Sequence, residues 1–275
     1  MLAVSSLRLH WPEYTMEAGE MAVYLFSTCA FATLLQHPVS PVRHFIASAL
    51  LRRAFMGLAV GATVAALVMT PWGKQSGGHF NPAITFTFYR LGNVEFWDAV
   101  FYVIAQFTGA TIGVFIAAYV LQGAPGNVSV RYAVTAPGKY GSAWAFLGEV
   151  AISFALMGTI LFASNRQPLG RYTPYFVGAL YATFITFETP LSGMSMNPAR
   201  TLGSAFPAGY WHAIWIYFAA PTLGMLVAAE VFLQGRRGVG PYCAKLDHNN
   251  NKRCIFHHGS RTVPAREFNS KEIGK

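Results

Sequence analysis

Long apolar stretches constrain the fold of this 275-residue chain more than any other feature. A helix needs about 20 mainly apolar residues to cross the hydrocarbon core of a bilayer. Six stretches approach that length: 17–36, 54–72, 96–121, 143–164, 173–190 and 211–234. Inside lipid every backbone polar group must be satisfied within the protein, which leaves helices and closed barrels as spanning structures. The stretches therefore predict an all-α membrane protein.

The charged residues agree with this class. Only 11% of the residues are charged, whereas a soluble domain usually has about a quarter. The net charge of +9 could suggest a nucleic-acid partner, but nine of the 20 Lys and Arg follow Leu233 in a polar tail and the others flank apolar stretches. Basic flanks and tails of this kind are ordinary topology signals of membrane proteins. We therefore expect the lipid bilayer, and no nucleic acid, as a partner.

Neither the cysteines nor the N-terminus indicates a secreted protein. The three cysteines, Cys29, Cys243 and Cys254, are too few and too scattered for a disulfide framework. The first residues lack a basic segment followed by an apolar core and a cleavage site. We expect the first apolar stretch to be a true span.

An internal repeat divides the chain. "GEMA" (19–22) and "GEVA" (148–151) open the first and fourth stretches, while "NPAIT" (81–85) and "NPART" (197–201) follow the second and fifth. Each half thus contains three spans, so the second half must enter the membrane from the opposite side, which is an inverted repeat. Residues 82–92 and 198–206 are too short to cross. We expect them to be two re-entrant half-helices whose starts meet near the midplane.

Asn-Pro-Ala is a helix start signal. Proline is favoured at the first helical position, and asparagine caps a helix by accepting a bond from a free backbone N–H. The capping role leaves the side-chain NH2 of Asn81 and Asn197 as donors, and two helix N-termini place positive dipole ends at one point. A water molecule can accept both bonds, whereas protons and other cations are opposed. The pattern predicts a pore for neutral solutes lined by the two motifs: Asn81, Pro82, Ala83, Asn197, Pro198 and Ala199.

The two motifs, in the contexts "SGGHFNPAIT" and "MNPART", resemble the signature loops of the aquaporins, members of the major intrinsic protein family. The resemblance covers about residues 15–235. It implies a six-helix bundle with two half-helices and an inverted repeat, a channel and not an enzyme, no cofactor, and usually a homotetramer. Thr201 after the arginine, where glycerol facilitators usually have aspartate, together with Ala205 and the Tyr217–Phe218 pair, resembles the aquaporin branch.

The resemblance also implies a selectivity filter near the outer mouth. It includes Arg200, and counting from the motifs adds Met194, Ile185 and Val60, with Gly61 as the alternative to Val60. Water-selective members commonly have aromatic and histidine residues where this chain has aliphatic ones. The solute therefore stays open between water and another neutral molecule: hydrogen peroxide, ammonia, glycerol or urea.

Four further polar residues in or near the spans have two interpretations each. His79 lines the vestibule or is a satisfied structural histidine. Glu20 and Glu149 occupy matching repeat positions, and we expect them to anchor the re-entrant loops, although an ion- or proton-coupled transporter could use such carboxylates. Glu188 pairs with Arg200 or, as we favour, lies in a solvated loop.

The expected organisation is a cytoplasmic segment (1–14), a channel domain (15–235, with repeats at about 15–121 and 143–234) and a flexible basic tail (236–275). With both termini cytoplasmic, five Lys and Arg plus the nine of the tail lie inside and six lie outside, as the positive-inside rule requires. We expect a plasma (inner) membrane protein. The cysteines and histidines of residues 243–258 could bind a soft metal, but their spacing matches no zinc pattern, so a solvated tail without metal is expected.

Overall fold

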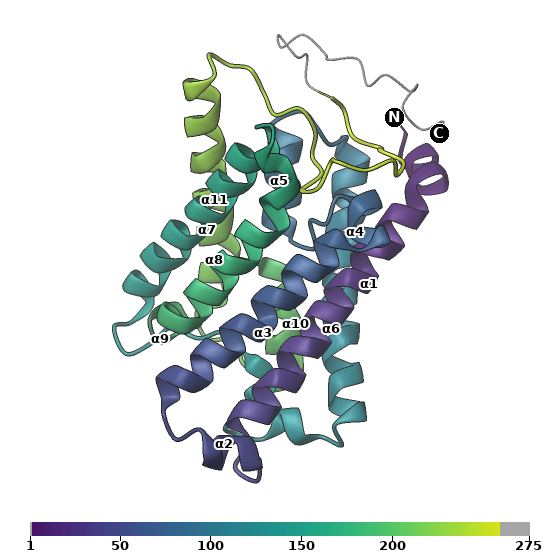
Figure 1. The fold of residues 1–275 in the computed structure, drawn as a ribbon. Coiled ribbons are helices and arrows are strands. Elements are labelled where there is room, and N and C mark those ends of the chain that lie inside the picture. The colour runs from purple at the N-terminus through teal and green to yellow at the C-terminus, as the bar shows by residue number, and fades with distance from the viewer. Residues whose placement is uncertain (1, 259–275) are drawn as a thin grey trace, which may run out of the picture.

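The computed structural model describes residues 2–258, and every regular element in that range is helical. Figure 1 shows the helices as one elongated bundle. In chain order they are α1 (Ala3–Gln36), α2 (Pro41–Phe45), α3 (Ala49–Met69), α4 (Pro71–Ser76), α5 (Pro82–Arg90), α6 (Phe96–Val120), α7 (Ser142–Ser164), α8 (Thr173–Phe187), α9 (Thr189–Ser192), α10 (Pro198–Ala208) and α11 (Ile216–Gly235). Single 3-10 turns lie at Ala124–Gly126, Arg131–Ala133 and Leu169–Tyr172.

Five of these helices are long and apolar enough to cross a membrane: α1, α3, α6, α7 and α11. The other predicted span corresponds to α8, which has only 15 residues. At about 1.5 Å per residue it covers roughly 22 Å, less than the hydrocarbon thickness. Glu188 ends this helix, and the chain continues directly into α9. The all-α membrane fold is confirmed, with one span shorter than its apolar stretch suggested.

Helix α1 begins well before the first apolar stretch. It has 34 residues and starts at Ala3, so the segment expected to precede the first span is largely helical. Two of its polar side chains bond to α6: His10 Nδ1 lies 2.8 Å from Asp98 Oδ1, and the Tyr14 hydroxyl donates to the same oxygen at 2.6 Å. An apolar pattern does not detect a helix whose buried face is polar.

Small residues bring the paired helices into close contact. A Cβ atom on Gly109 would lie 2.1 Å from the Ala18 carbonyl oxygen, and one on Gly113 would lie 2.3 Å from that of Ala22. No side chain fits at those distances, so the two glycines of α6 let the backbone of α1 pack directly against it. This is the small-residue packing typical of membrane helices.

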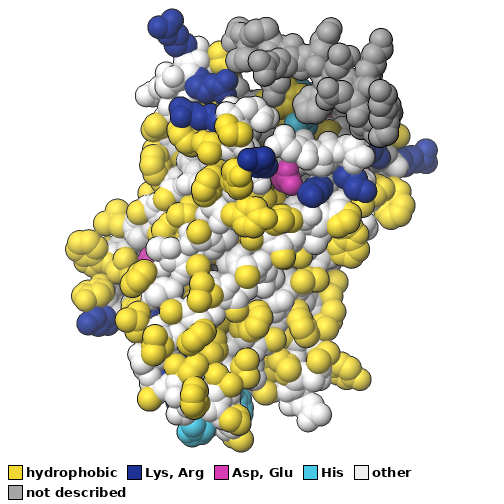
Figure 2. All heavy atoms as spheres, viewed as in Figure 1, with side chains coloured by type: hydrophobic (Ala, Val, Ile, Leu, Met, Phe, Trp, Pro, Cys, Tyr) yellow, Lys and Arg dark blue, Asp and Glu magenta, His cyan; other side chains and the backbone are white. Residues whose placement is uncertain are grey.

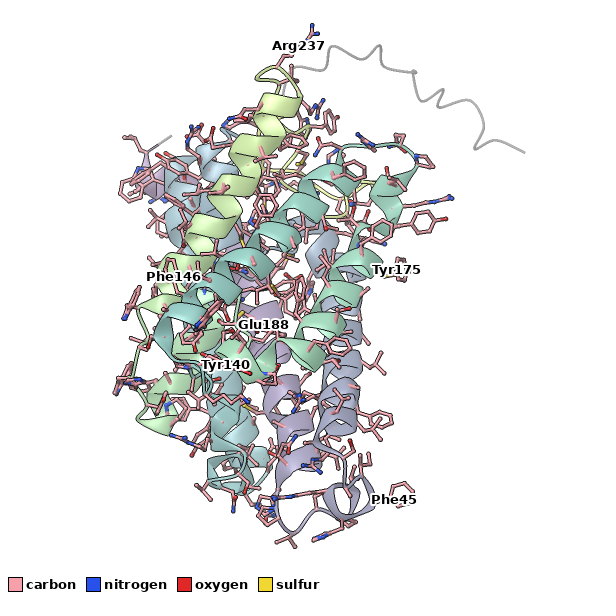
Figure 3. All side chains as sticks on the ribbon, turned by 90° about the vertical axis from the view of Figure 1, so that its left-hand side faces the viewer. Phe45, Tyr140, Phe146, Tyr175, Glu188 and Arg237 are labelled. Carbon is pink, nitrogen blue, oxygen red and sulfur yellow. The ribbon has the colours of Figure 1, made fainter. Side chains whose placement is uncertain are left out.

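The surface separates an apolar middle from a basic end. In Figure 2 hydrophobic side chains cover the middle of the visible face, while most of the visible Lys and Arg gather at one end. We call this the tail end, because residues 239–258 run over it, and the opposite one the α2 end (Figure 1). Arg237 and Phe45 mark the two ends in Figure 3.

The described part of the tail differs from the solvated segment that we expected. Ala244 and Leu246 are 0% and 1% exposed. Lys245 is equally buried, which lowers its pKa, and its ammonium donates to the carbonyls of Lys252 and Arg253 at 3.2 and 2.6 Å. The tail packs on the bundle because its few apolar side chains are buried there. The polar composition of the tail as a whole does not indicate this packing. Residues 259–275 of the predicted tail lie outside the described residues.

Candidate functional site: a pore between two half-helices

The half-helices α5 and α10 begin at the two Asn-Pro-Ala motifs, and each asparagine caps its own helix. Asn81 Oδ1 accepts from the Ala83 N–H at 2.9 Å, while Asn197 Oδ1 accepts from those of Ala199 and Arg200 at 3.0 and 3.2 Å. Pro82 and Pro198 occupy the first helical position. The local fold is the one that asparagine and proline favour at a helix start.

The two motifs are also bonded to each other. Asn81 Nδ2 donates to the Met196 carbonyl and Asn197 Nδ2 donates to the Phe80 carbonyl, both at 2.8 Å. An amide NH2 carries two hydrogens, so this reciprocal pair uses one from each side chain. Asn197 Nδ2 also donates to Met21 Sδ, a weak acceptor, at 3.9 Å, whereas the second hydrogen of Asn81 has no further partner within residues 2–258.

Glu149 holds the loop that leads into α10. One of its oxygens accepts from the Ser192 hydroxyl and the Ser195 N–H, and the other accepts from the Met196 N–H, each at 2.7 Å. Met194 and Met196 have left-handed φ angles of 51° and 54°, which cost energy in residues other than glycine. The carboxylate bonds stabilise this strained loop.

In the first half of the chain, two carboxylates hold the loop that leads into α5. Within the described residues Glu20, the repeat partner of Glu149, accepts only from the Ser76 hydroxyl, at 3.2 Å. The backbone amides of His79 and Phe80 donate instead to Glu17, at 2.9 and 2.6 Å, and Gln106 donates to Glu17 at 2.7 Å. Glu17 was not singled out from the sequence, although it lies three residues before Glu20 and therefore on the same helix face.

His79 is fully buried, and both ring nitrogens have partners. Nδ1 lies 3.1 Å from Thr85 Oγ1, and Nε2 lies 2.8 Å from the Ala244 carbonyl oxygen. The ring stacks between Phe88 and Phe256, with centroids 5.2 and 5.4 Å away. These contacts favour the structural role over the vestibule role.

A cavity of about 230 Å³ leads from the α2 end toward the motifs. The four residues of the predicted filter all line it: Val60, Ile185, Met194 and Arg200. Tyr24 and Thr28 of α1 are further lining residues that the sequence did not single out. Gly61 faces away, since a Cβ atom there would lie 2.3 Å from the Gly178 carbonyl oxygen of α8. The geometry thus favours Val60 over Gly61 as the lining residue.

Arg200 is the only charged member of the predicted filter. It is 7% exposed, and within residues 2–258 its Nη1 atom has no hydrogen-bond partner. Glu188 forms no ion pair with it in that range, and both carboxylate oxygens of Glu188 are buried, so the solvated loop that we favoured is wrong as well. Figure 3 shows Glu188 within the height of the bundle, not at its end. A buried cationic donor thus faces the cavity.

Polar backbone held at depth inside a helical membrane bundle is tolerated where it is buried in protein or lines a pore. Here it meets a cavity, and this arrangement is that of a membrane channel. The family model of the major intrinsic proteins matches residues 8–232. The chain therefore belongs to the major intrinsic protein family, which consists of channels and not of enzymes, and the predicted resemblance is confirmed.

Related proteins agree with this assignment. Aquaporin TIP2-1 of Arabidopsis thaliana is 30% identical over 84% of this chain and 88% of its own length. Aquaporin NIP2-3 of Zea mays is 33% identical over 68% of this chain, and the chain spans only 60% of that relative. The solved aquaglyceroporin of Plasmodium falciparum matches 81% of this chain and 95% of its own with a TM-score of 0.64 and 18% identity, which shows the fold alone.

Proposed function

We propose that the protein is a passive channel for water or another small neutral solute, with Asn81 and Asn197 as central donors and Arg200 in the filter. The observation that carries the proposal is the cavity lined by Arg200, whose Nη1 has no partner in the described chain. A solute oxygen that enters this cavity can accept a hydrogen bond from this donor. The positive charge and the two half-helix N-termini oppose cations and protons.

The aliphatic residues of the filter bear on the choice of solute. Val60, Ile185 and Met194 offer no side-chain hydrogen bond to replace the hydration that a solute loses. Such a constriction would slow water and admit another small neutral solute: hydrogen peroxide, ammonia, glycerol or urea. The names of the relatives, aquaporins, favour water.

An ion-coupled transporter is the second candidate. Its carboxylates would have to exchange protons or ions during transport. Glu149 and Glu17 each accept several hydrogen bonds from the loops, which favours a structural role and hence the channel.

Stopped-flow light scattering on proteoliposomes tests the proposal. Water, glycerol, urea and peroxide are compared in vesicles with and without the protein, and the pH gradient and membrane potential are then dissipated. We expect faster flux of at least one of these solutes, unaffected by dissipation. A strict gradient requirement would support the transporter instead.

We further propose that the tail end is cytoplasmic, that the protein lies in the plasma (inner) membrane and that four copies assemble. The Lys and Arg balance supports the orientation, and the many exposed apolar side chains of the helices suit contact with lipid or neighbouring copies. Native mass spectrometry after release from detergent tests the assembly. A monomer that conducts would contradict it.

A further inference from the structure

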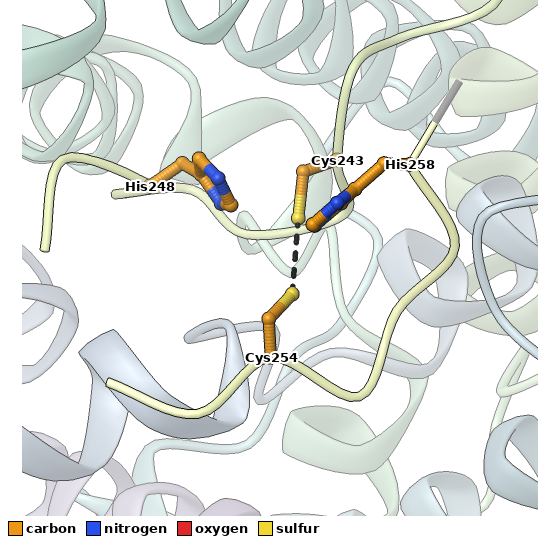
Figure 4. A group of neighbouring side chains, drawn as sticks. All are labelled: Cys243, His248, Cys254 and His258. Atoms are coloured by element: carbon orange, nitrogen blue, oxygen red, sulfur yellow. Dashed lines mark hydrogen bonds between the residues drawn. The ribbon is translucent and has the colours of Figure 1, made fainter. Parts of the chain in front are cut away.

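Four side chains that can bind a metal meet in the tail. They are Cys243, His248, Cys254 and His258, and one ligand atom from each lies within 4.8 Å of all the others. Figure 4 shows the two sulfur atoms facing each other with an imidazole ring on either side. The residues come from a segment for which the sequence predicted no ordered site, because the ligands approach one another only after the chain folds back.

The distances suit a tetrahedral zinc ion. Zinc binds cysteine sulfur at about 2.3 Å and histidine nitrogen at about 2.0 Å, so two sulfur ligands lie about 3.8 Å apart. The Cys243 and Cys254 sulfur atoms are 3.5 Å apart, whereas a disulfide requires about 2.05 Å. The remaining ligand atoms need to move inward by only roughly 1 Å to complete the tetrahedron.

Neighbouring residues hold the ligands in place. The Tyr242 ring stacks on His258 and meets His248 edge-on, with both centroids 4.9 Å away. The Tyr242 N–H in turn donates to Asn165 Oδ1 at 2.7 Å, which anchors this part of the tail to the end of α7. These contacts restrict the orientations of the two imidazole rings.

We propose that Cys243, His248, Cys254 and His258 form a structural zinc site. Two thiolates and two imidazoles in a tetrahedral arrangement are typical of zinc, while hard cations prefer oxygen ligands. A closed set of four protein ligands leaves no open position, which is typical of a structural and not a catalytic site.

Metal analysis of the full-length protein, purified without chelators, tests this site. We expect about one zinc per chain, in line with one four-ligand site. Cys254→Ser and His258→Ala should each lose most of it. The controls His257→Ala and Cys29→Ser should keep it, because His257 contacts Glu95 and Cys29 lies in α1. Cobalt-substituted protein should show the visible absorption of tetrahedral thiolate-bound Co²⁺.

Three results would overturn the zinc site. One is protein that neither contains zinc nor takes it up saturably. Another is equal zinc content in the cluster variants and their controls. The third is a Cys243–Cys254 disulfide, or stoichiometric iron or copper in place of zinc, in the purified protein.

The same segment contacts the re-entrant loop before Asn81 through atoms other than these ligand side chains. The Ala244 carbonyl accepts from His79, and the Leu246 N–H donates to the Gly77 carbonyl at 3.0 Å. The Phe256 ring lies on His79 at a centroid distance of 5.4 Å. In Figure 1 the segment crosses the tail end above α4 and α5.

These contacts point to a second inference, which rests on the proposed channel function: residues 241–257 cover the tail-end approach to the pore. Asn93 fastens both ends of this cover, since its Nδ2 donates to the carbonyls of Pro241 and His257 at 3.1 and 2.9 Å. Zinc bound within the cover would hold it in one shape. Loss of the metal or of the Phe256 contact should loosen it and raise permeability.

Permeability of Phe256→Ala proteoliposomes tests the cover. We expect a severalfold rise over wild type, while the control Phe55→Ala, on an exposed part of α3, should match wild type. If the wild type conducts and Phe256→Ala has the same permeability, the proposal that residues 241–257 cover the pore is wrong. If neither they nor a chelator-treated wild type conducts, the channel function itself fails, whereas the zinc analysis stands independently.

Discussion

The two re-entrant loops share their motif but differ in almost everything around it. Both asparagines cap a half-helix and donate to the opposite loop. The loop before Asn197 is held by one carboxylate, Glu149, and opens into the cavity beside Arg200. The loop before Asn81 is held by Glu17 and Glu20 and lies beneath the tail. The motif is common to both loops. The residues around it differ, so that one loop borders the proposed filter and the other lies under the tail.

The largest expected effect follows from removing the single carboxylate of the second half. Glu149→Gln leaves one acceptor oxygen for three donors and sets an NH2 group against backbone N–H groups. Hydrogen bonds to charged groups contribute about 1.5–3 kcal/mol each, so we expect a loss of at least about 3 kcal/mol. Thermal unfolding in detergent measures it. Unchanged stability would show that the loop holds its strained conformation without Glu149.

The same substitution at Glu17 sharpens the comparison. Glu17 also accepts three bonds, from His79, Phe80 and Gln106. We therefore expect Glu17→Gln to destabilise the protein about as much as Glu149→Gln, although the repeat aligns Glu149 with Glu20. A much smaller loss than at Glu149 would mean that the first loop does not depend on this carboxylate.

The loss of stability on replacing each capping asparagine should follow the number of hydrogen bonds that the asparagine makes. Asn197→Ala removes two capping hydrogen bonds and one bond between the loops, while Asn81→Ala removes one of each. A typical hydrogen bond contributes about 1 kcal/mol of net stability. We expect Asn197→Ala to be the more destabilising by roughly that amount, measured by thermal unfolding. The reverse order would contradict the assignment of the caps.

Arg200→Val makes the second motif resemble the first, which has Ile84 at this position. We expect the flux of glycerol or of cations to rise about tenfold, which corresponds to about 1.4 kcal/mol of barrier. Proteoliposome flux assays measure it, with Ile84→Val as the control for a substitution on the other half-helix. Identical selectivity in Arg200→Val would exclude the filter role.

The smallest effect should come from Glu20. Its one hydrogen bond in residues 2–258 comes from the Ser76 hydroxyl, which can rotate and donate equally well to an amide oxygen. We expect Glu20→Gln to change the stability by less than about 1 kcal/mol. A loss of stability as large as that of Glu17→Gln would contradict this expectation. It would show that Glu20, which the repeat aligns with Glu149, also holds the loop before Asn81.

Hydropathy and the repeated motif predicted the helical bundle and the positions of both half-helices, because apolar length and helix capping are local properties. The choice between Glu17 and Glu20 was not available from the repeat, since both lie on one helix face and only the loop decides which one it meets. The buried polar start of α1 and the folded tail depend on partners distant in sequence, such as Asp98 and His79. A polar composition does not reveal those partners.

The central claim is passive permeation between the two half-helices. Osmotic and solute permeability of proteoliposomes, measured with zinc and with a chelator after dissipation of all ion gradients, tests it most directly. The account predicts permeability above that of protein-free vesicles in the chelator-treated sample, and lower permeability with zinc. Permeability equal to that of protein-free vesicles for every solute in both conditions would contradict it.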